Sequence, residues 1–300
     1  MKPRLLVVAD TYYPQVDGTL RFMEEFLPRA KKDFELSLLV PLFGKQKKLQ
    51  EGIPITFIDT SRWISLSGYA LMKLSWKNIK NIRKAVAQNG VLFIQGPALI
   101  SYLATFFGQR YRKRTITYIH VIPWELYEQF LPPLVNHVVS FFVKRLSIWL
   151  FNQSNLVIVP YAGLQQELRQ SGVHSPIEVA KLGVDITRFT PLDQKESLRK
   201  KFALPPEAFV IGYVGRISAE KNIAVLIEAY RQAHISNKVL LLVGAGEPAT
   251  MERYRHLPQV RVTGFVTNVE DYLKAMDVFV MPSLTETTSL ATLEAMSSGL

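Results

Sequence analysis

The chain has 300 residues, of which 48% are hydrophobic, and it carries a formal net charge of +11 and no cysteine. This length suits two domains, and the hydrophobic content excludes a disordered chain. The absence of cysteine excludes disulfide bonds and thiolate chemistry. No apolar run reaches the roughly 20 residues of a transmembrane helix, and the N-terminal segment does not resemble a signal peptide. We therefore expect a cytoplasmic protein, with peripheral attachment to the inner face of the cell membrane as the alternative.

The strands and helices of the first half follow from short β-branched runs that alternate with longer helical patterns, which is typical of parallel α/β units. The predicted strands are Arg4–Ala9, Leu36–Pro41, Ile55–Ile58, Val91–Gln95, Thr115–Ile119 and Leu156–Val159. The predicted helices are Leu20–Lys32, one within Gly68–Asn89, and Leu134–Phe151.

The pattern starts again after a polar stretch that ends at Pro206. The predicted strands here are Phe209–Val214, Lys238–Val243, Val260–Thr263 and Val278–Met281, and the predicted helices are Ala224–Ala233, Ala249–His256, Val269–Ala275 and Ala291–Ser298. Two successive α/β sets predict two facing Rossmann-like domains with parallel sheets, which bind ligands at the carboxyl ends of their strands. We place the domains at 1–186 and 206–300, with a linker at 187–205. The second domain is expected to be incomplete, because the chain stops directly after a helix and its following glycine.

The positive charge is concentrated in the first domain. Residues 1–185 hold 23 Lys/Arg against 13 Asp/Glu, whereas residues 186–300 hold 13 against 12. We expect a negative partner there, such as an anionic membrane surface or an acidic acceptor; an ordinary basic surface that keeps the protein in solution is the alternative. Nucleic acid is not expected, because this half lacks a recognisable nucleic-acid-reading motif.

The segment from Val278 to Gly299 carries the most informative motif. Polar residues follow its strand, and Thr287, Thr288 and Ser289 can cap the next helix, whose N-terminal amides attract anions. Glu286 lies in the loop and Glu294 lies within the helix, so their carboxylates could accept hydrogen bonds from sugar or ribose hydroxyls. The alternative is a pair of solvated glutamates, because this spacing is common.

A second motif, in the segment from Phe209 to Asn222, places cations after a strand. Gly215 lets a ligand approach the backbone, and Arg216 and Lys221 are suited to neutralise phosphates. The alternative is a surface turn with two solvated cations. The segment Leu240–Glu247 contains a Gly-Ala-Gly run that matches part of a phosphate-binding loop. A tight structural turn is at least as good an interpretation of this run.

Two candidate sites lie at strand ends of the first domain. In the loop Asp10–Gly18, Gly18 would allow a phosphate or acceptor oxygen close to the backbone, and Asp17 and Tyr13 are candidates to bind acceptor hydroxyls. A plain strand-to-helix turn is an equally good interpretation of this loop. His120 follows the strand Thr115–Ile119 and is a candidate active-site group, although a structural role is the more usual one for a single histidine.

These segments together resemble glycosyltransferase family 4, whose members have the GT-B fold of two facing Rossmann-like domains. The resemblance rests on Glu286 and Glu294 with seven residues between them, on the Gly-Arg…Glu-Lys-Asn run that begins at Gly215, and on Gly183-Val184-Asp185. It implies that Arg216 and Lys221 bind the donor diphosphate, Glu286 the donor sugar and Glu294 the ribose. The further implied donor contacts are the backbone amides of Thr288, Ser289 and Leu290, the base-pocket residues Phe265 and Val266, Gly18 at the diphosphate, and His120 near the transferred sugar.

The resemblance also implies a reaction. Family members retain the configuration at the anomeric carbon, so we expect a hexose to pass from a UDP- or GDP-sugar to an acceptor hydroxyl. No cofactor or metal is expected, because cations and helix amides are present and no ligand motif is found. The Thr-Thr-Ser that follows Glu286, where the family usually has a glycine-rich loop, leaves the sugar open. A nucleotide-sugar epimerase and an inactive, truncated nucleotide-binding fragment are the alternatives.

The acceptor is expected to be a membrane lipid or a cell-envelope glycan. Leu134–Phe151 is aromatic, apolar and cationic, as is a helix that lies on a membrane surface. A basic helix face around Lys73–Lys84 would favour anionic lipid further. The alternative is that Leu134–Phe151 is a buried helix of the first domain.

Overall fold

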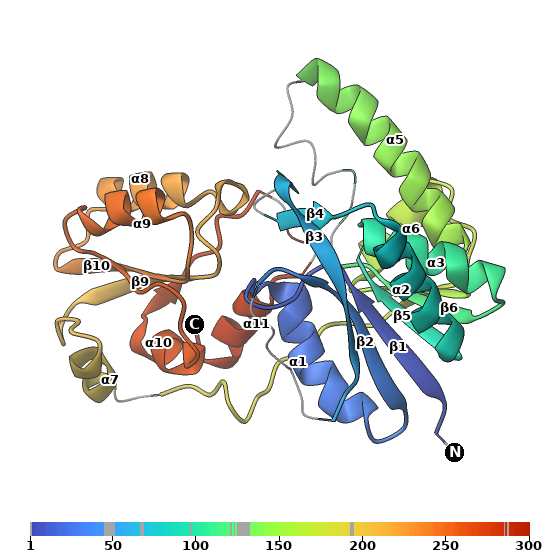
Figure 1. Ribbon diagram of the computed structural model, residues 1–300. Helices are drawn as coiled ribbons and strands as arrows, with labels where there is room; N and C mark the ends of the chain where they lie inside the picture. The colour runs from blue at the N-terminus through green and yellow to red at the C-terminus, as the bar shows by residue number, and fades with distance from the viewer. Residues whose placement is uncertain are drawn as a thin grey trace. The chain divides into compact units, whose positions relative to one another are not determined.

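The computed structural model describes residues 2–44, 52–66, 69–96, 98–120, 122, 124, 133–192, 195–284, 286 and 288–300 (Figure 1). The chain divides into two compact units, Met1–Lys181 (unit 1) and Leu182–Leu300 (unit 2). Both are α/β units with parallel sheets, so the predicted fold class is confirmed at that level. Among the described residues, no helix is long and apolar enough to cross a membrane.

Unit 1 contains an eight-stranded sheet within its described residues, in the order β4-β3-β2-β1-β5-β6-β7-β8. The strands are β1 (Arg4–Ala9), β2 (Glu35–Leu42), β3 (Ile55–Leu66), β4 (Tyr69–Met72), β5 (Val91–Gln95), β6 (Arg114–Tyr118), β7 (Leu156–Val159) and β8 (Ile177–Val179). The helices are α1 (Gly18–Ala30), α2 (Trp76–Gln88), α3 (Leu99–Arg110), α5 (Pro133–Asn152) and α6 (Ala162–Gln170). All pairings are parallel except β3 with β4.

The centre of this sheet is the buried strand β1. Val7 and Val8 have no exposed surface, and β1 pairs with β2 on one side and β5 on the other. A strand buried on both faces reads as a continuous apolar run, which explains why its bounds were predicted correctly. From β1 the strand order runs through β2 to β3 on one side and through β5 to β8 on the other. The ends of β1 and β5 therefore form the switch point where such sheets bind ligands.

Among the described elements of unit 1, four were not predicted: α3, α6, β4 and β8. Helix α3 is preceded by Ala98, which cannot cap it. The cap comes instead from Asp10 at the end of β1, whose carboxylate accepts hydrogen bonds from the Ala98 and Ile100 amides, both at 3.2 Å, and from the Ser101 hydroxyl. A local N-cap signal is therefore missing from the sequence, because the capping group lies 88 residues earlier.

Unit 2 contains a four-stranded parallel sheet within its described residues, in the order β11-β10-β9-β12. The strands are β9 (Phe209–Val214), β10 (Lys238–Val243), β11 (Val260–Val262) and β12 (Val278–Phe279). The helices are α7 (Glu196–Lys201), α8 (Ile223–Gln232), α9 (Pro248–Arg255), α10 (Val269–Ala275) and α11 (Leu290–Ser297), with one 3₁₀ turn at Ala219–Lys221. The chain passes from β9 to β10 and β11, then returns to β12 on the other side of β9. The carboxyl ends of β9 and β12 therefore form the switch point of this sheet.

Alternating residues of β9 face two apolar layers. Val210 and Val214 pack with α10 and α11, whereas Ile211 and Tyr213 pack with α8 and α9. Figure 1 shows these helix pairs on opposite faces of the sheet. This period of two along the strand follows from the pleat of the backbone.

The stretch predicted as a linker, 187–205, packs on unit 2. Phe189 and Leu204 are 5% and 3% exposed and belong to the core beside α10 and α11. The Ser297 hydroxyl donates a hydrogen bond to the Phe189 carbonyl at 2.6 Å, which ties this stretch to the last turn of α11. This stretch therefore lies within unit 2, which begins at Leu182.

Candidate functional site

A tight turn follows β9 at the switch point of unit 2. Gly215 has φ +150°, which is unfavourable for a residue with a Cβ, and such an atom would lie 2.6 Å from the Tyr213 hydroxyl. That hydroxyl donates a hydrogen bond to the Arg216 carbonyl at 2.8 Å. The turn therefore places Arg216 directly beyond the strand end, where sequence reasoning expected a phosphate-binding cation.

The Gly-Ala-Gly run after β10 supports this turn. A Cβ on Gly244 would lie 1.9 Å from the Gly215 carbonyl oxygen, and one on Gly246 would lie 2.3 Å from the Ile217 carbonyl oxygen. Ile217 and Gly246 also pair as an isolated parallel bridge. Both glycines are required by close backbone packing, which agrees with the interpretation of this run as a tight structural turn.

Glu220 holds Arg216 in place. One Arg216 guanidinium nitrogen lies 2.5 Å from Glu220 Oε1, and the Ser218 hydroxyl donates to the same oxygen at 2.7 Å. Burial alone would raise the pKa of Glu220, but the bonds from Ser218 and Arg216 outweigh it and lower the pKa. The Leu284 amide donates to the Glu220 carbonyl at 3.0 Å, which joins this turn to the loop after β12.

Two of the predicted catalytic residues, Lys221 and Glu286, form an ion pair. The Lys221 ammonium donates to Glu286 Oε1, and the Ser283 hydroxyl donates to the same oxygen at 3.0 Å. The two side chains are 22% and 28% exposed, so the pair is partly shielded yet open to a ligand. Burial, followed by the charges of Glu286 and Glu220, raises the pKa of the Tyr213 hydroxyl, which therefore stays neutral.

The N-terminus of α11 lies in the same loop segment. Ser289 is the N-cap residue, and its hydroxyl accepts a hydrogen bond from the Thr292 amide at 3.1 Å, as predicted for this serine. Leu290 is the first helical residue, and Glu294 is a partly buried residue of the helix. Thr288 precedes the cap, and the neighbouring Thr287 lies outside the described residues.

The two residues predicted to line a base pocket differ in environment. The Phe265 side chain is 56% exposed after β11, whereas Val266 packs against the core beside α10. A stacking contact with a nucleobase is open to Phe265, and Val266 has a packing role.

In unit 1, α1 begins at the predicted N-terminal loop. Asp17 is its N-cap residue and accepts a hydrogen bond from the Leu20 amide at 2.9 Å. A Cβ on Gly18 would meet no atom within 4 Å, and its φ is not in the left-handed region. The Tyr13 hydroxyl donates to Glu24, which also pairs with Arg21 at 2.7 Å. Asp17 and Tyr13 thus both have structural partners of their own.

His120 lies at the switch point of unit 1, beside Gln95 at the end of β5. Its Nε2 atom is 3.2 Å from Gln95 Oε1, and its ring contacts Phe22 and Tyr118 at centroid distances of 5.1 and 4.6 Å. No described residue bonds to Gln95 Nε2 or to the Thr11 hydroxyl, although both atoms are buried. Sequence reasoning missed Gln95 and Thr11, and the available signal was a polar residue at or just after the end of an apolar strand.

The pH dependence of unit 1 should reveal the state of His120. Burial lowers its pKa to about 3. Between about pH 3 and the ordinary pKa of about 6.5, the unfolded chain binds a proton that the folded chain does not, so stability falls as the pH falls. We expect His120 to cost roughly 1–2 kcal/mol of the free energy of unfolding at pH 5 relative to pH 7.5. Urea unfolding followed by tryptophan fluorescence tests this, because all four tryptophans lie in residues 1–181.

The variant His120→Gln supplies the control for this titration. It removes the titrating ring while keeping a polar side chain, so its stability should change less between pH 7.5 and 5. Equal slopes for the two proteins would show that His120 is protonated in the folded state as readily as in the unfolded chain.

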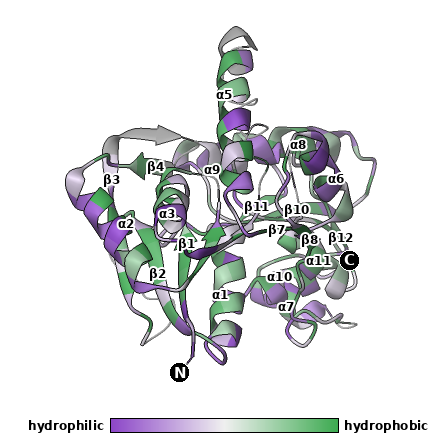
Figure 2. Ribbon diagram, turned by 90° about the vertical axis from the view of Figure 1, so that its right-hand side faces the viewer, coloured by the Kyte–Doolittle hydropathy of each residue, from purple (hydrophilic) through white to green (hydrophobic). Residues whose placement is uncertain are grey.

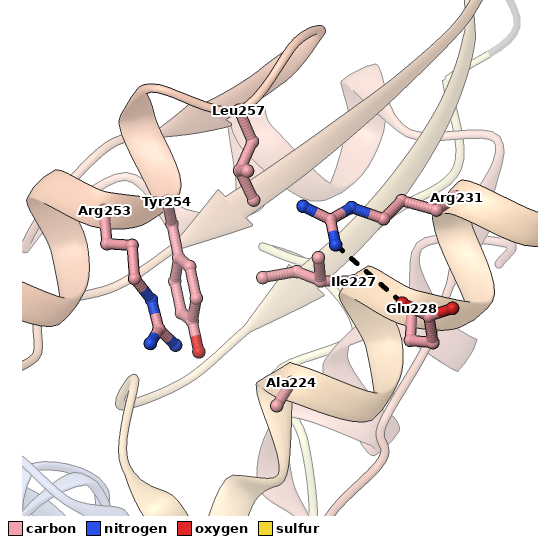
Figure 3. A pocket seen from close by; sticks show the side chains of 7 residues that line it. All are labelled: Ala224, Ile227, Glu228, Arg231, Arg253, Tyr254 and Leu257. Atoms are coloured by element: carbon pink, nitrogen blue, oxygen red, sulfur yellow. Dashed lines mark ion pairs between the residues drawn. The ribbon is translucent and has the colours of Figure 1, made fainter.

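A separate hollow of about 280 Å³ lies between α8 and α9 (Figure 3). Ile227 and Leu257 form part of its lining, and Arg231 and Arg253 flank it. It lies between helices that cover the sheet, and none of the predicted site residues line it. We therefore assign the site to the strand ends, where the loops place charged groups. Among the described residues, no group of three His, Asp or Glu side chains could hold a metal ion.

Comparisons with known proteins agree with this arrangement. The family model "Glycosyltransferase Family 4" matches residues 17–188, and "Glycosyl transferases group 1" matches residues 208–300. The fold is similar to that of Anabaena HepE, whose structure was solved in complex with UDP and glucose. The two structures have a TM-score of 0.75 and 17% sequence identity, and the match covers 99% of this chain and 79% of the HepE chain.

Two curated relatives extend the comparison. The UDP-Gal:α-D-GlcNAc-diphosphoundecaprenol α-1,3-galactosyltransferase of Escherichia coli is 35% identical over 135 residues, which are 41% of this chain and 35% of that protein. The α-monoglucosyldiacylglycerol synthase of Acholeplasma laidlawii is 22% identical over 99% of this chain and 79% of its own length. The chain thus spans about a third of the first relative's length.

The two α/β units with parallel sheets have the GT-B class of fold. The chain belongs to glycosyltransferase family 4.

Proposed function

We propose that the protein transfers a hexose from a UDP- or GDP-sugar to an acceptor hydroxyl, with retention of the anomeric configuration. The observation that carries this proposal is the Lys221–Glu286 pair at the switch point of unit 2. It joins a cation suited to a diphosphate with a carboxylate suited to sugar hydroxyls. The parallel pairing of β9 with β12 brings these residues, which are 65 positions apart, together at the strand ends.

The residues have complementary roles in the proposed reaction. Arg216 and Lys221 neutralise the diphosphate as the bond between C1 of the sugar and the phosphate oxygen breaks, which is the step where electrostatic stabilisation is most effective. The acceptor oxygen bonds to C1 on the same face, and its proton passes to the departing phosphate oxygen. Glu286 orients the sugar, and Glu294 accepts bonds from the ribose. The amides at the start of α11 offer further donors to phosphate.

The donor and acceptor classes rest on the relatives. The HepE structure is a complex with UDP and glucose, and the galactosyltransferase is named for a UDP-sugar and a lipid-linked acceptor. The glucosyldiacylglycerol synthase is named for a lipid product. These relatives support a nucleotide-sugar donor and a lipid or cell-envelope glycan acceptor. We infer that the protein reaches such an acceptor while attached at the membrane surface. Metal-independent transfer stays a prediction.

A transfer assay tests the proposal. Radiolabelled UDP-glucose, UDP-galactose and GDP-mannose are each incubated with the protein, with and without a mixed-lipid acceptor. We expect a labelled glycolipid from one donor, and EDTA should leave its yield unchanged. An epimerised nucleotide sugar formed without acceptor would support the epimerase instead. Donor binding without any product would support a nucleotide-binding fragment.

Gly18 supplies an independent prediction. Because a Cβ at this position meets no protein atom, Gly18→Ala should leave the free energy of unfolding unchanged or raise it by up to about 1 kcal/mol, as expected for alanine in a helix. If a ligand oxygen approaches the Gly18 backbone, the added methyl should weaken ligand binding about tenfold. Isothermal calorimetry with the donor, beside a urea titration, measures both. An unchanged donor affinity would remove Gly18 from the donor site.

A further inference from the structure

Helix α5 is attached to unit 1 through one face. Leu150 and Phe151 on this face have 0% and 1% exposure and lie in the core beside β7 and α6. The Ser147 hydroxyl lies 3.0 Å from the Tyr102 hydroxyl of α3, so the two helices are neighbours. These contacts fix the orientation of α5 on its own unit.

The opposite face of α5 is also apolar, and it is exposed. Its side chains are 42–65% exposed: Val138, Phe141, Phe142, Leu146 and Trp149. The others follow Val138 at spacings of three, four, eight and eleven residues, which places them along one side of a helix with about 3.6 residues per turn. In Figures 1 and 2, one end of α5 extends away from the rest of unit 1. The interpretation of this helix as wholly buried is therefore wrong, because only its inner side is covered.

Helix α3 enlarges this surface. Phe106 is 52% exposed and lies on the same side of α3 as Tyr102 and Gln109, by helical spacing. Tyr102 contacts Ser147, and Gln109 donates to the Gln153 carbonyl just beyond α5. Phe106 therefore lies beside α5. We call Phe106 together with the five exposed residues of α5 the α5 surface.

The positive charge of the α5 surface indicates the kind of partner that it binds. Arg145 lies between the exposed apolar side chains along the helix, and its guanidinium lies 5.6 Å from the centre of the Phe141 ring. Lys144 is next to it, and α5 contains no acidic residue. From Ala98 to Asn155 the sequence has six Lys/Arg and two Asp/Glu. Two copies of this face would bring arginines together without carboxylates, which disfavours a symmetric dimer.

An anionic lipid surface matches both the exposed apolar side chains and the positive charge of the α5 surface. Phenylalanine, tryptophan and leucine gain free energy on entering the boundary of headgroups and acyl chains, and tryptophan is enriched there. Arginine extends its charged end to the phosphates while its stem covers apolar surface. Each cation near an anionic surface adds about 1 kcal/mol.

We propose that the α5 surface binds an anionic membrane, with Phe141, Phe142 and Trp149 inserted at the interface and Arg145 at the lipid phosphates. This deepens the proposed function, because it identifies the element that would bring the protein to a lipid-borne acceptor. Vesicle binding is nevertheless measurable without donor or acceptor, so the two proposals can fail separately.

Flotation with vesicles tests the proposal. The purified protein is mixed with phosphatidylcholine vesicles that contain or lack phosphatidylglycerol at roughly 30%, a fraction chosen to resemble an anionic membrane. We expect binding to the phosphatidylglycerol vesicles, with a blue shift of tryptophan emission that Trp149→Phe reduces. Phe141→Ser combined with Phe142→Ser should lower the partition coefficient at least about tenfold. Arg145→Glu should weaken binding only to the anionic vesicles.

A matched control and a fold check accompany these variants. Val225 on α8 of unit 2 is 55% exposed, and Val225→Ser should bind vesicles like the wild type. Unchanged urea unfolding of the phenylalanine variant shows that unit 1 is intact, since both side chains are exposed. Wild-type partitioning of that variant overturns the proposal. So does a dimer in sedimentation analysis that the same substitutions dissociate, because it would make a second copy the partner.

Discussion

Replacing Lys221 by alanine is expected to lower kcat/KM for hexose transfer by about 10²–10³, the range for loss of one group that stabilises developing charge. In the absence of ligand, the Lys221 ammonium is held by Glu286, close to Arg216 at the end of β9. Bound diphosphate would give this cation a second anionic partner, whose charge grows as the bond to the sugar breaks. The loss should therefore be greater in turnover than in donor affinity.

The stability of the Lys221→Ala variant separates catalysis from folding. The Lys221–Glu286 pair is 22% and 28% exposed, so its removal should change the free energy of unfolding by no more than about 1 kcal/mol. Lys201→Ala is the matched control, because Lys201 forms an ion pair with Asp271 at 2.9 Å in the same unit. Its kcat/KM should equal that of the wild type. Wild-type turnover of the Lys221 variant would remove Lys221 from the catalytic groups.

Glu286→Gln extends the test to the other partner. It keeps the size and the hydrogen-bond acceptor oxygen of Glu286 but removes its charge. If Lys221 and Glu286 act as a unit, the double variant should lose less than the product of the two single losses. The combined losses would multiply if the two residues acted independently.

The fold was largely predictable because its determinants are local. Buried strands such as Arg4–Ala9 and Phe209–Val214 are continuous apolar runs between polar turns, and their observed bounds equal the predicted ones. Helix α3 shows where this reasoning fails, because Asp10 caps it from a distant strand. The stretch 187–205 shows the same limit, because Phe189 and Leu204 gain their role only through a core assembled from later residues.

The sequence predicted the main charged residues of the candidate site, but it did not predict the contacts that hold them in place. Arg216, Lys221 and Glu286 follow strands, and parallel topology brings strand ends together. Glu220 belongs to the motif that begins at Gly215, but its contact with Arg216 and the contact of Ser283 with Glu286 were not predicted. Gln95 and Thr11 were missed because a polar residue at a strand end is common. What distinguishes them is a buried side-chain atom without a hydrogen-bond partner, Nε2 of Gln95 and the hydroxyl oxygen of Thr11.

Asp277→Ala should be strongly destabilising, lowering the stability of unit 2 by about 3 kcal/mol. One Asp277 oxygen accepts bonds from the Arg199 guanidinium at 2.6 Å and the Val210 amide at 2.8 Å, and the other accepts from Lys195 at 3.2 Å. Arg199 is only 8% exposed, so removing the carboxylate leaves a buried cation without its counter-charge. Asp277 itself is 24% exposed, which places the effect at the lower end of the range for broken buried pairs.

Hydrogen exchange is the appropriate measurement, because two units need not unfold in one transition. Exchange of peptides from β9 and β10 should accelerate in the Asp277 variant, whereas peptides from β1 and β5 should be unchanged. Adding Arg199→Met should restore part of the protection, since an apolar side chain of similar length needs no counter-charge. Lys201→Ala, which breaks an exposed pair, should cost less than about 1 kcal/mol. Equal exchange in the single and double variants would mean that the unpaired charge of Arg199 is not the cause, and that the lost bond to Val210 dominates instead.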